Sequence, residues 1–239
     1  MIKLDILAIG AHPDDVELGA GATIAKEISQ GKKVGILDLT RGELGTRGSA
    51  EIRDQEARSS AQILGVSLRE NLAFADGFFV NDKAHQLEVI KIIRKYQPEI
   101  VLCNAIDDRH IDHAKGAKLV SDACFLSGLR KIITEEKGLE QKAWRPKFVY
   151  HYIQWKNIEP DFVVDVGPFI DKKLEAVKAF SSQFYDPDSK EPTSPIATKN
   201  FLDSITYRAQ DMGRIIGADY AEGFTTERYV GVKSFFDLI

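Results

Sequence analysis

Two tetrapeptides carry most of the chain's potential for chemistry: His12-Pro13-Asp14-Asp15 and His110-Ile111-Asp112-His113. They hold three of the five histidines in the 239-residue sequence, each beside carboxylates. Each tetrapeptide follows a short apolar run, at 6–10 and 100–103, that predicts a buried strand. Imidazole and carboxylate groups at strand ends are what a hydrolytic metal site requires. If the two strand ends are neighbours in space, we expect an enzyme.

The elements that must position these residues alternate along the first two thirds of the chain. Hydrophobic patterning predicts strands over 3–10, 33–40, 71–75 and 99–104, and helices over 16–30, 50–64, 85–96 and 112–126. This alternation predicts an α/β fold with a Rossmann-like, doubly wound and mainly parallel sheet. If its strand order is 3-2-1-4, the strands before the two tetrapeptides are adjacent, and ligands bind outside their carboxyl ends.

The last third of the sequence predicts a smaller C-terminal portion. Further strands are expected over 147–154 and 162–166, helices over 168–180 and 200–216, a proline-containing loop over 184–196, and a last strand over 229–235. No composition shift marks a linker. We therefore expect one domain over 1–239, with a core to about 183 and the C-terminal portion over about 184–239.

Composition excludes several classes of protein. A net charge of −4 without a long basic run argues against nucleic acid as a partner. No stretch approaches the roughly 20 apolar residues of a membrane span, and no signal-peptide core is seen near the start. Cys103 and Cys124 both lie in apolar patterns, which predicts buried thiols and a cytoplasmic, reducing location.

The spacing of the six polar residues divides their roles only in part. A catalytic zinc site commonly has three protein ligands, so six candidates leave some free to move protons. Asp14 and Asp15 diverge at a helix start, so one can bind metal while the other faces the attacking water. His110 and His113 can both face one site if the segment turns. A protonated histidine there can stabilise an oxyanion or protonate a leaving amine.

The first motif, 11–17, paired with 110–113 resembles the PIG-L/LmbE family of zinc-dependent N-acetylglucosaminyl deacetylases. The resemblance extends over nearly the whole chain, through Gly19-Ala20-Gly21, 39–43, Arg53 with Glu56, Asp76-Gly77, 182–184 and 220–224. Length and the later segments are most similar to the bacillithiol-biosynthesis deacetylases, which act on N-acetylglucosaminyl malate. One departure is Ile111, where the family usually has proline.

The resemblance implies roles for the matching positions. The ligands of zinc, with iron(II) as the other candidate, would be His12, Asp15 and His113. Asp14 would be the general base. His110 would stabilise the oxyanion or act as acid, oriented by Asp112. Arg53 would hold the aglycone, and Asp76 would bind sugar hydroxyls. The reaction would release acetate from a small-molecule N-acetylglucosaminide. Relatives imply a homo-oligomer, with a hexamer as the candidate form.

Plainer interpretations exist for several of these residues. Asp14, Asp15 or Asp112 could cap a helix. Arg53 lies on a charged helix and could belong to a solvated face, and Asp76 before a glycine is also a turn signal. The two remaining histidines lack acidic neighbours in the sequence and are expected to be structural: His85 and His151.

Other functions compete with the deacetylase. Deacetylation of another N-acetylglucosaminide is the nearest one. A non-haem iron oxygenase would use His12, Asp14 and His113, but such sites usually lie in β barrels. A nucleotide-binding oxidoreductase lacks its glycine fingerprint here, although Asp38 imitates the ribose-binding acid. A non-enzymatic module with the same fold is the last alternative, but it would have lost catalysis while keeping all the polar residues of both tetrapeptides.

Overall fold

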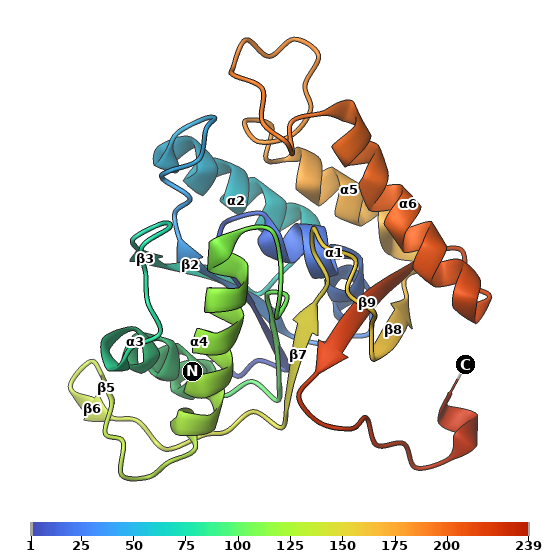
Figure 1. Cartoon of the computed structure of the whole chain (residues 1–239). Helices are drawn as coiled ribbons and strands as arrows, with labels where there is room; N and C mark the ends of the chain where they lie inside the picture. The colour runs from blue at the N-terminus through green and yellow to red at the C-terminus, as the bar shows by residue number, and fades with distance from the viewer. Residues whose placement is uncertain (1, 239) are drawn as a thin grey trace.

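The computed structural model describes residues 2–238, which form an α/β fold around a seven-stranded sheet (Figure 1). The strands are β1 Ile6–Gly10, β2 Val34–Thr40, β3 Leu68–Phe74, β4 Ile100–Cys103, β7 Phe148–Tyr152, β8 Phe162–Asp165 and β9 Ala221–Thr226. The α-helices are α1 Asp15–Ser29, α2 Ala50–Leu64, α3 Lys83–Tyr96, α4 Ile111–Ser127, α5 Ile170–Lys178 and α6 Lys199–Ile216. A two-stranded hairpin, β5 Glu135–Glu136 with β6 Leu139–Glu140, and two 3₁₀ turns, Gly167–Phe169 and Phe235–Asp237, complete the described chain.

The strand order is β3-β2-β1-β4-β7-β9-β8, which confirms the predicted 3-2-1-4 arrangement of the first four strands. The pairs from β3 to β7 are parallel, and β9 runs antiparallel to both of its neighbours. In register, Ile6 of β1 lies opposite Val34 of β2 on one side and Ile100 of β4 on the other. The mainly parallel sheet of the predicted fold class is therefore confirmed.

Both faces of the sheet are covered, as a doubly wound fold requires. Leu7 and Ile9 of β1 pack into a core cluster with α3 and α4, whereas Ile6 and Ala8 pack into another with α1. All five residues of β1 are buried, which explains its continuous apolar run. The edge strand β3 is only half-buried, and its weaker pattern explains why only its second half was predicted.

The predicted last strand over 229–235 is wrong. Instead, β9 at Ala221–Thr226 inserts between β7 and β8, and α6 packs against it. Residues 229–235 carry a strand-like apolar pattern, but Tyr229 and Phe235 are exposed on a segment that leaves the body of the molecule (Figure 1). A strand needs a partner for its backbone groups, and among residues 2–238 this segment has none.

Between residues 2 and 238, no helix combines the length and the apolar composition needed to cross a membrane. Cys103 and Cys124 are buried free thiols, as expected.

Candidate active site

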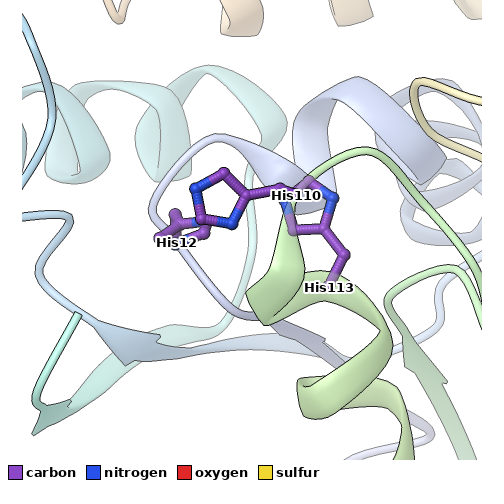
Figure 2. Close-up of side chains that lie close together, drawn as sticks. All are labelled: His12, His110 and His113. Carbon is purple, nitrogen blue, oxygen red and sulfur yellow. The ribbon is translucent and has the colours of Figure 1, made fainter. Parts of the chain in front are cut away.

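The parallel pairing of β1 with β4 brings the two tetrapeptides together at one edge of the sheet. The loop after β1 carries the first motif, and the first turn of α4 carries the second. Figure 2 shows the rings of His12, His110 and His113 grouped in one place. The ring centroids are 4.5 Å apart for His12 and His110, and 5.1 Å apart for His110 and His113. The expected contact between the two strand ends is therefore present.

Asp15 lies between two of these imidazoles. Its Oδ1 is 3.1 Å from His113 Nε2, and its Oδ2 is 3.4 Å from His12 Nδ1. Potential ligand atoms of His12, His110 and His113 also lie within 4.8 Å of one another, as do those of His12, Asp76 and Asp112. Among the described residues both groups include His12, and neither includes Asp15, whose contacts with His12 and His113 place it beside them.

The far nitrogen of each proposed ligand histidine is held by carboxylates. His12 Nε2 is 3.1 Å from Asp76 Oδ1 and 3.4 Å from Asp112 Oδ2. His113 Nδ1 is 2.5 Å from Asp108 Oδ2. Metal-binding histidines usually donate their second N–H to such a partner, which fixes the tautomer and the ring. The residues present therefore fit a metal ion, and they leave His12 Nδ1 and His113 Nε2 turned toward Asp15.

Three residues of this environment were missed by the sequence reasoning. Asp108 precedes the second motif in an Asp107-Asp108 pair whose acidity was the only available signal. Asn104 Nδ2 donates to Asp15 Oδ2 at 3.0 Å, and Gln154 Nε2 donates to Asp15 Oδ1 at 2.8 Å. These amides follow β4 and β7, so strand adjacency brings them to Asp15, and no spacing in the sequence points to them.

The ionisation of Asp15 follows from the same contacts. Burial alone would raise its pKa, but the charges and hydrogen bonds of His113 and His12 hold the pKa well below its usual range. The carboxylate is therefore anionic, as a metal ligand must be.

Asp14 faces the pocket and is paired with Arg53. It stands just before α1 at φ 121°, yet its side chain makes no capping hydrogen bond to that helix. A non-glycine residue rarely adopts this backbone region, and such strain concentrates at functional sites. Burial raises the pKa of Asp14 to about 7, against the lowering effect of the Arg53 charge. Because the Asp14 side chain makes no hydrogen bond to the helix, its interpretation as a side-chain cap is wrong.

Arg53 is buried rather than solvated. Its Nη2 donates to Asp14 Oδ2 at 2.7 Å and to the Pro13 carbonyl at 3.1 Å, and its Nη1 donates to the Gly42 carbonyl at 3.3 Å. Gly42 has φ +65°, and a Cβ there would overlap with the guanidinium. Arg53 therefore contacts Asp14 and the backbone around it. Its expected contact with an aglycone stays a prediction.

The second motif differs from expectation in how its side chains are oriented. The N-cap of α4 is His110, whose Nδ1 accepts the Asp112 backbone N–H at 3.3 Å. The buried Asp112 carboxylate instead accepts from Gly77 N and Lys115 Nζ, both at 2.7 Å, and faces His12. Because Asp112 points across the first turn of α4, its described side-chain contacts orient His12 rather than His110. Burial, together with the nearby His12 and His113, lowers the pKa of His110.

Asp76 combines a turn with a site contact. Its Oδ2 accepts the Leu44 backbone N–H at 2.9 Å, and its Oδ1 faces His12. The two other histidines lie outside the pocket lining. The expectation that they lack acidic neighbours is nevertheless wrong for both. Asp82 Oδ1 lies 2.7 Å from His85 Nδ1, and Glu227 Oε1 lies 3.2 Å from His151 Nε2.

A cavity of about 630 Å³ opens over these residues. Residues of both motifs line it, together with the loops at 44–47, 76–78 and 108–109, the segments 153–155 and 194–196, and parts of α1, α2, α5, α6 and β9. Ligand sites of small molecules commonly have this size, and in open α/β sheets they lie outside the carboxyl ends of the strands. Fold and site together define a doubly wound α/β protein with a histidine–carboxylate pocket able to hold a metal ion.

Comparison with known proteins supports this class and gives the family. Residues 7–124 match the PIG-L family, described as GlcNAc-PI de-N-acetylase. Diacetylchitobiose deacetylase from Thermococcus kodakarensis is 31% identical over 230 residues, which cover 91% of this chain and 81% of that protein. The chain therefore belongs to the PIG-L family.

Solved structures agree with the fold over almost the whole length. The conserved protein TT1542 from Thermus thermophilus superposes with a TM-score of 0.86 at 33% identity, covering 97% of this chain and 98% of that chain. The N,N'-diacetylchitobiose deacetylase from Pyrococcus horikoshii, complexed with its inhibitor MPG, gives a TM-score of 0.78 at 26% identity, covering 98% and 88%.

Proposed function

We propose that this protein is a metal-dependent N-deacetylase that hydrolyses the acetamide of an N-acetylglucosaminide. The observation that carries the proposal is the arrangement of Asp14, held by Arg53, beside the His12–Asp15–His113 group in one substrate-sized cavity. The PIG-L relatives named as deacetylases of diacetylchitobiose support the sugar substrate.

His12, Asp15 and His113 would hold the ion, with zinc as the first candidate and iron(II) as the second. When bound, the ion supplies a Lewis acid that polarises the amide carbonyl and makes a water more acidic. The carboxylates behind the two histidines would keep their rings in place.

Asp14 would take the proton from the attacking water. Its pKa of about 7 suits a group that accepts a proton and then passes it to the leaving amine. Arg53 would hold the carboxylate in position throughout, since its guanidinium also bonds two backbone carbonyls.

His110 would stabilise the developing oxyanion. Its Nδ1 accepts a backbone N–H, so the ring proton of the neutral form belongs on Nε2, which is then a donor. The lowered pKa favours this neutral donor over the alternative role as a charged acid. Asp76 would bind sugar hydroxyls with the carboxylate that also faces His12.

The proposed aglycone is malate, on the resemblance to the bacillithiol-biosynthesis deacetylases, with other N-acetylglucosaminides as the alternative. Acetate release from a panel of N-acetylglucosaminides with malyl, sugar and inositol aglycones tests both, with metal content measured on the same sample. If none of these compounds is hydrolysed, the proposed activity is refuted. A non-haem iron oxygenase fits the site less well, because its ligand set leaves Asp15 and His110 without a role.

We also propose that the protein forms a homo-oligomer in the cytoplasm. The exposed aromatic side chains near the C-terminus, Tyr229, Phe235 and Phe236, support an interface between copies. Light scattering after size exclusion tests this, and a monomeric mass would contradict it.

A further inference from the structure

One wall of the cavity carries a buried arginine that the proposed chemistry does not use. Arg47 lies in the loop after β2, lines the cavity and is 5% exposed. Its Nη1 donates to the Phe184 carbonyl at 3.3 Å, and its Nη2 donates to the Ser189 hydroxyl. Its buried Nε has no hydrogen-bond partner in the structure. A guanidinium offers five N–H donors, so this one is under-used.

The charge of Arg47 also lacks a counter-ion. Over residues 2–238, no carboxylate oxygen lies within 4.0 Å of its guanidinium. Two other buried arginines are paired with carboxylates: Arg53 with Asp14, and Arg69 with both Glu17 and Asp38. Arg94 is also buried without a carboxylate partner, but its donors are used by three backbone carbonyls and the Thr134 hydroxyl. Removing a cation from water without an anion beside it is costly, and buried charges are therefore normally paired.

The loop that carries Arg47 also contacts the proposed catalytic groups. Its Gly42 carbonyl accepts from Arg53, and its Leu44 backbone N–H donates to Asp76. Arg47 and Asp14 line the same cavity. A molecule that fills this cavity can therefore contact both Arg47 and the proposed base.

We infer that Arg47 recognises an anionic group, a carboxylate or a phosphate, on the aglycone of the substrate. This rests on the proposed deacetylation of an N-acetylglucosaminide and assigns the anion-binding part of its pocket to Arg47, whereas Arg53 is already neutralised by Asp14. A guanidinium forms paired, charge-assisted hydrogen bonds with either kind of anion. The ligand would thereby supply the counter-ion that the protein lacks.

The kinetic test compares one substrate pair across four proteins. N-acetylglucosaminyl malate and its neutral dimethyl ester are hydrolysed by the wild type and by the Arg47→Gln, Arg47→Lys and Arg208→Gln variants. Arg208 is the matched control, because it lines the same cavity without a carboxylate partner in the described chain but is only half-buried. A glycerol phosphate conjugate, added as a third substrate, distinguishes a phosphate from a carboxylate.

We expect the wild type to prefer an anionic substrate in kcat/KM. Arg47→Gln should lower that preference by about tenfold or more, the scale of a charged hydrogen bond, and Arg47→Lys should retain part of it. An equal loss on charged and neutral substrates would show a structural role and overturn the inference. So would a wild type without preference, or an Arg208→Gln variant that loses as much preference as Arg47→Gln.

A binding measurement separates this inference from the proposed activity. Malate alone and inorganic phosphate alone are titrated calorimetrically into wild type and Arg47→Gln of equal metal content. At least one of the two anions should bind the wild type about tenfold more tightly than it binds Arg47→Gln. Equal affinities of both proteins for both anions overturn the inference, whether or not any sugar is hydrolysed. Thermal unfolding of each variant verifies that it is folded.

Discussion

Arg53 donates a 2.7 Å hydrogen bond from Nη2 to Oδ2 of Asp14, and both side chains are almost completely buried. The pair joins α2 to the start of α1, and Gly42 leaves the space that the guanidinium occupies. This relationship fixes the position of the proposed general base before any substrate enters.

Replacing Asp14 removes the proposed base without removing a proposed metal ligand. Asp14→Asn should retain metal while kcat falls by about 10² or more, the scale of lost general-base catalysis. Steady-state kinetics and metal analysis on one preparation measure both. Near-normal turnover would exclude Asp14 as the base.

Arg53 is expected to act through Asp14. Arg53→Ala should lower kcat by about tenfold or more with less effect on KM, because the carboxylate loses its position. In the Asp14→Asn background the same change should have little further effect, since residues that act as a unit are not additive. Additive losses, or a loss confined to KM, would instead support a contact with the aglycone.

The choice between Asp15 and His110 as the third metal ligand can be measured directly. Asp15→Ala should lose metal together with activity, whereas His110→Ala should keep metal and lose activity, because Asp15 contacts both His12 and His113. Dialysis against a chelator should likewise abolish wild-type activity, and added zinc or iron(II) should restore it. Metal loss in His110→Ala with metal retained in Asp15→Ala would reverse the assignment.

Gly19 is where α1 approaches the sheet closely. A Cβ at this position would overlap with the ring of Tyr152, which is fully buried and donates from its hydroxyl to the Ile9 carbonyl at 2.9 Å. Gly19→Ala should lower the free energy of unfolding by about 1–3 kcal/mol, as overpacking does. Gly231→Ala, where a Cβ meets nothing within 4 Å, is the control. Equal stabilities in denaturant titration would contradict the close approach.

The stability contribution of His151 should depend on pH. Burial lowers its pKa, but Cys103, Glu227 and the Asn104 carbonyl together raise it to about 11. Because the pKa of His151 is higher in the folded protein than the unfolded value of about 6.5, protonated His151 stabilises the fold, and this contribution is complete below about pH 6.5. The contribution is then lost as pH rises toward 11. The difference in unfolding free energy between wild type and His151→Gln should therefore shrink between about pH 6 and pH 10. A constant or growing difference would contradict it.

The sequence by itself determined the local elements and the two motifs. Short, nearly continuous apolar runs predicted β1, β2 and β4, because these strands are covered on both faces and are buried along almost their whole length. His12 and His113 could be singled out because each follows such a run and lies beside carboxylates, a combination that is typical of metal sites. Where burial is partial, as in β3, the signal weakened.

Only the tertiary structure decided which side chains meet. Asp108, Asn104 and Gln154 reach the site because β1, β4 and β7 are neighbours, and the pairing of distant strands leaves no periodic trace in the sequence. The same holds for β9, whose place between β7 and β8 depends on partners about 55 to 75 residues away. In the sequence, Arg47 and Arg53 are two arginines six positions apart, and only Arg53 was singled out. Their difference, one paired with Asp14 and the other without a carboxylate in the described chain, exists only after folding, because a counter-ion is a matter of distance in space and not along the chain.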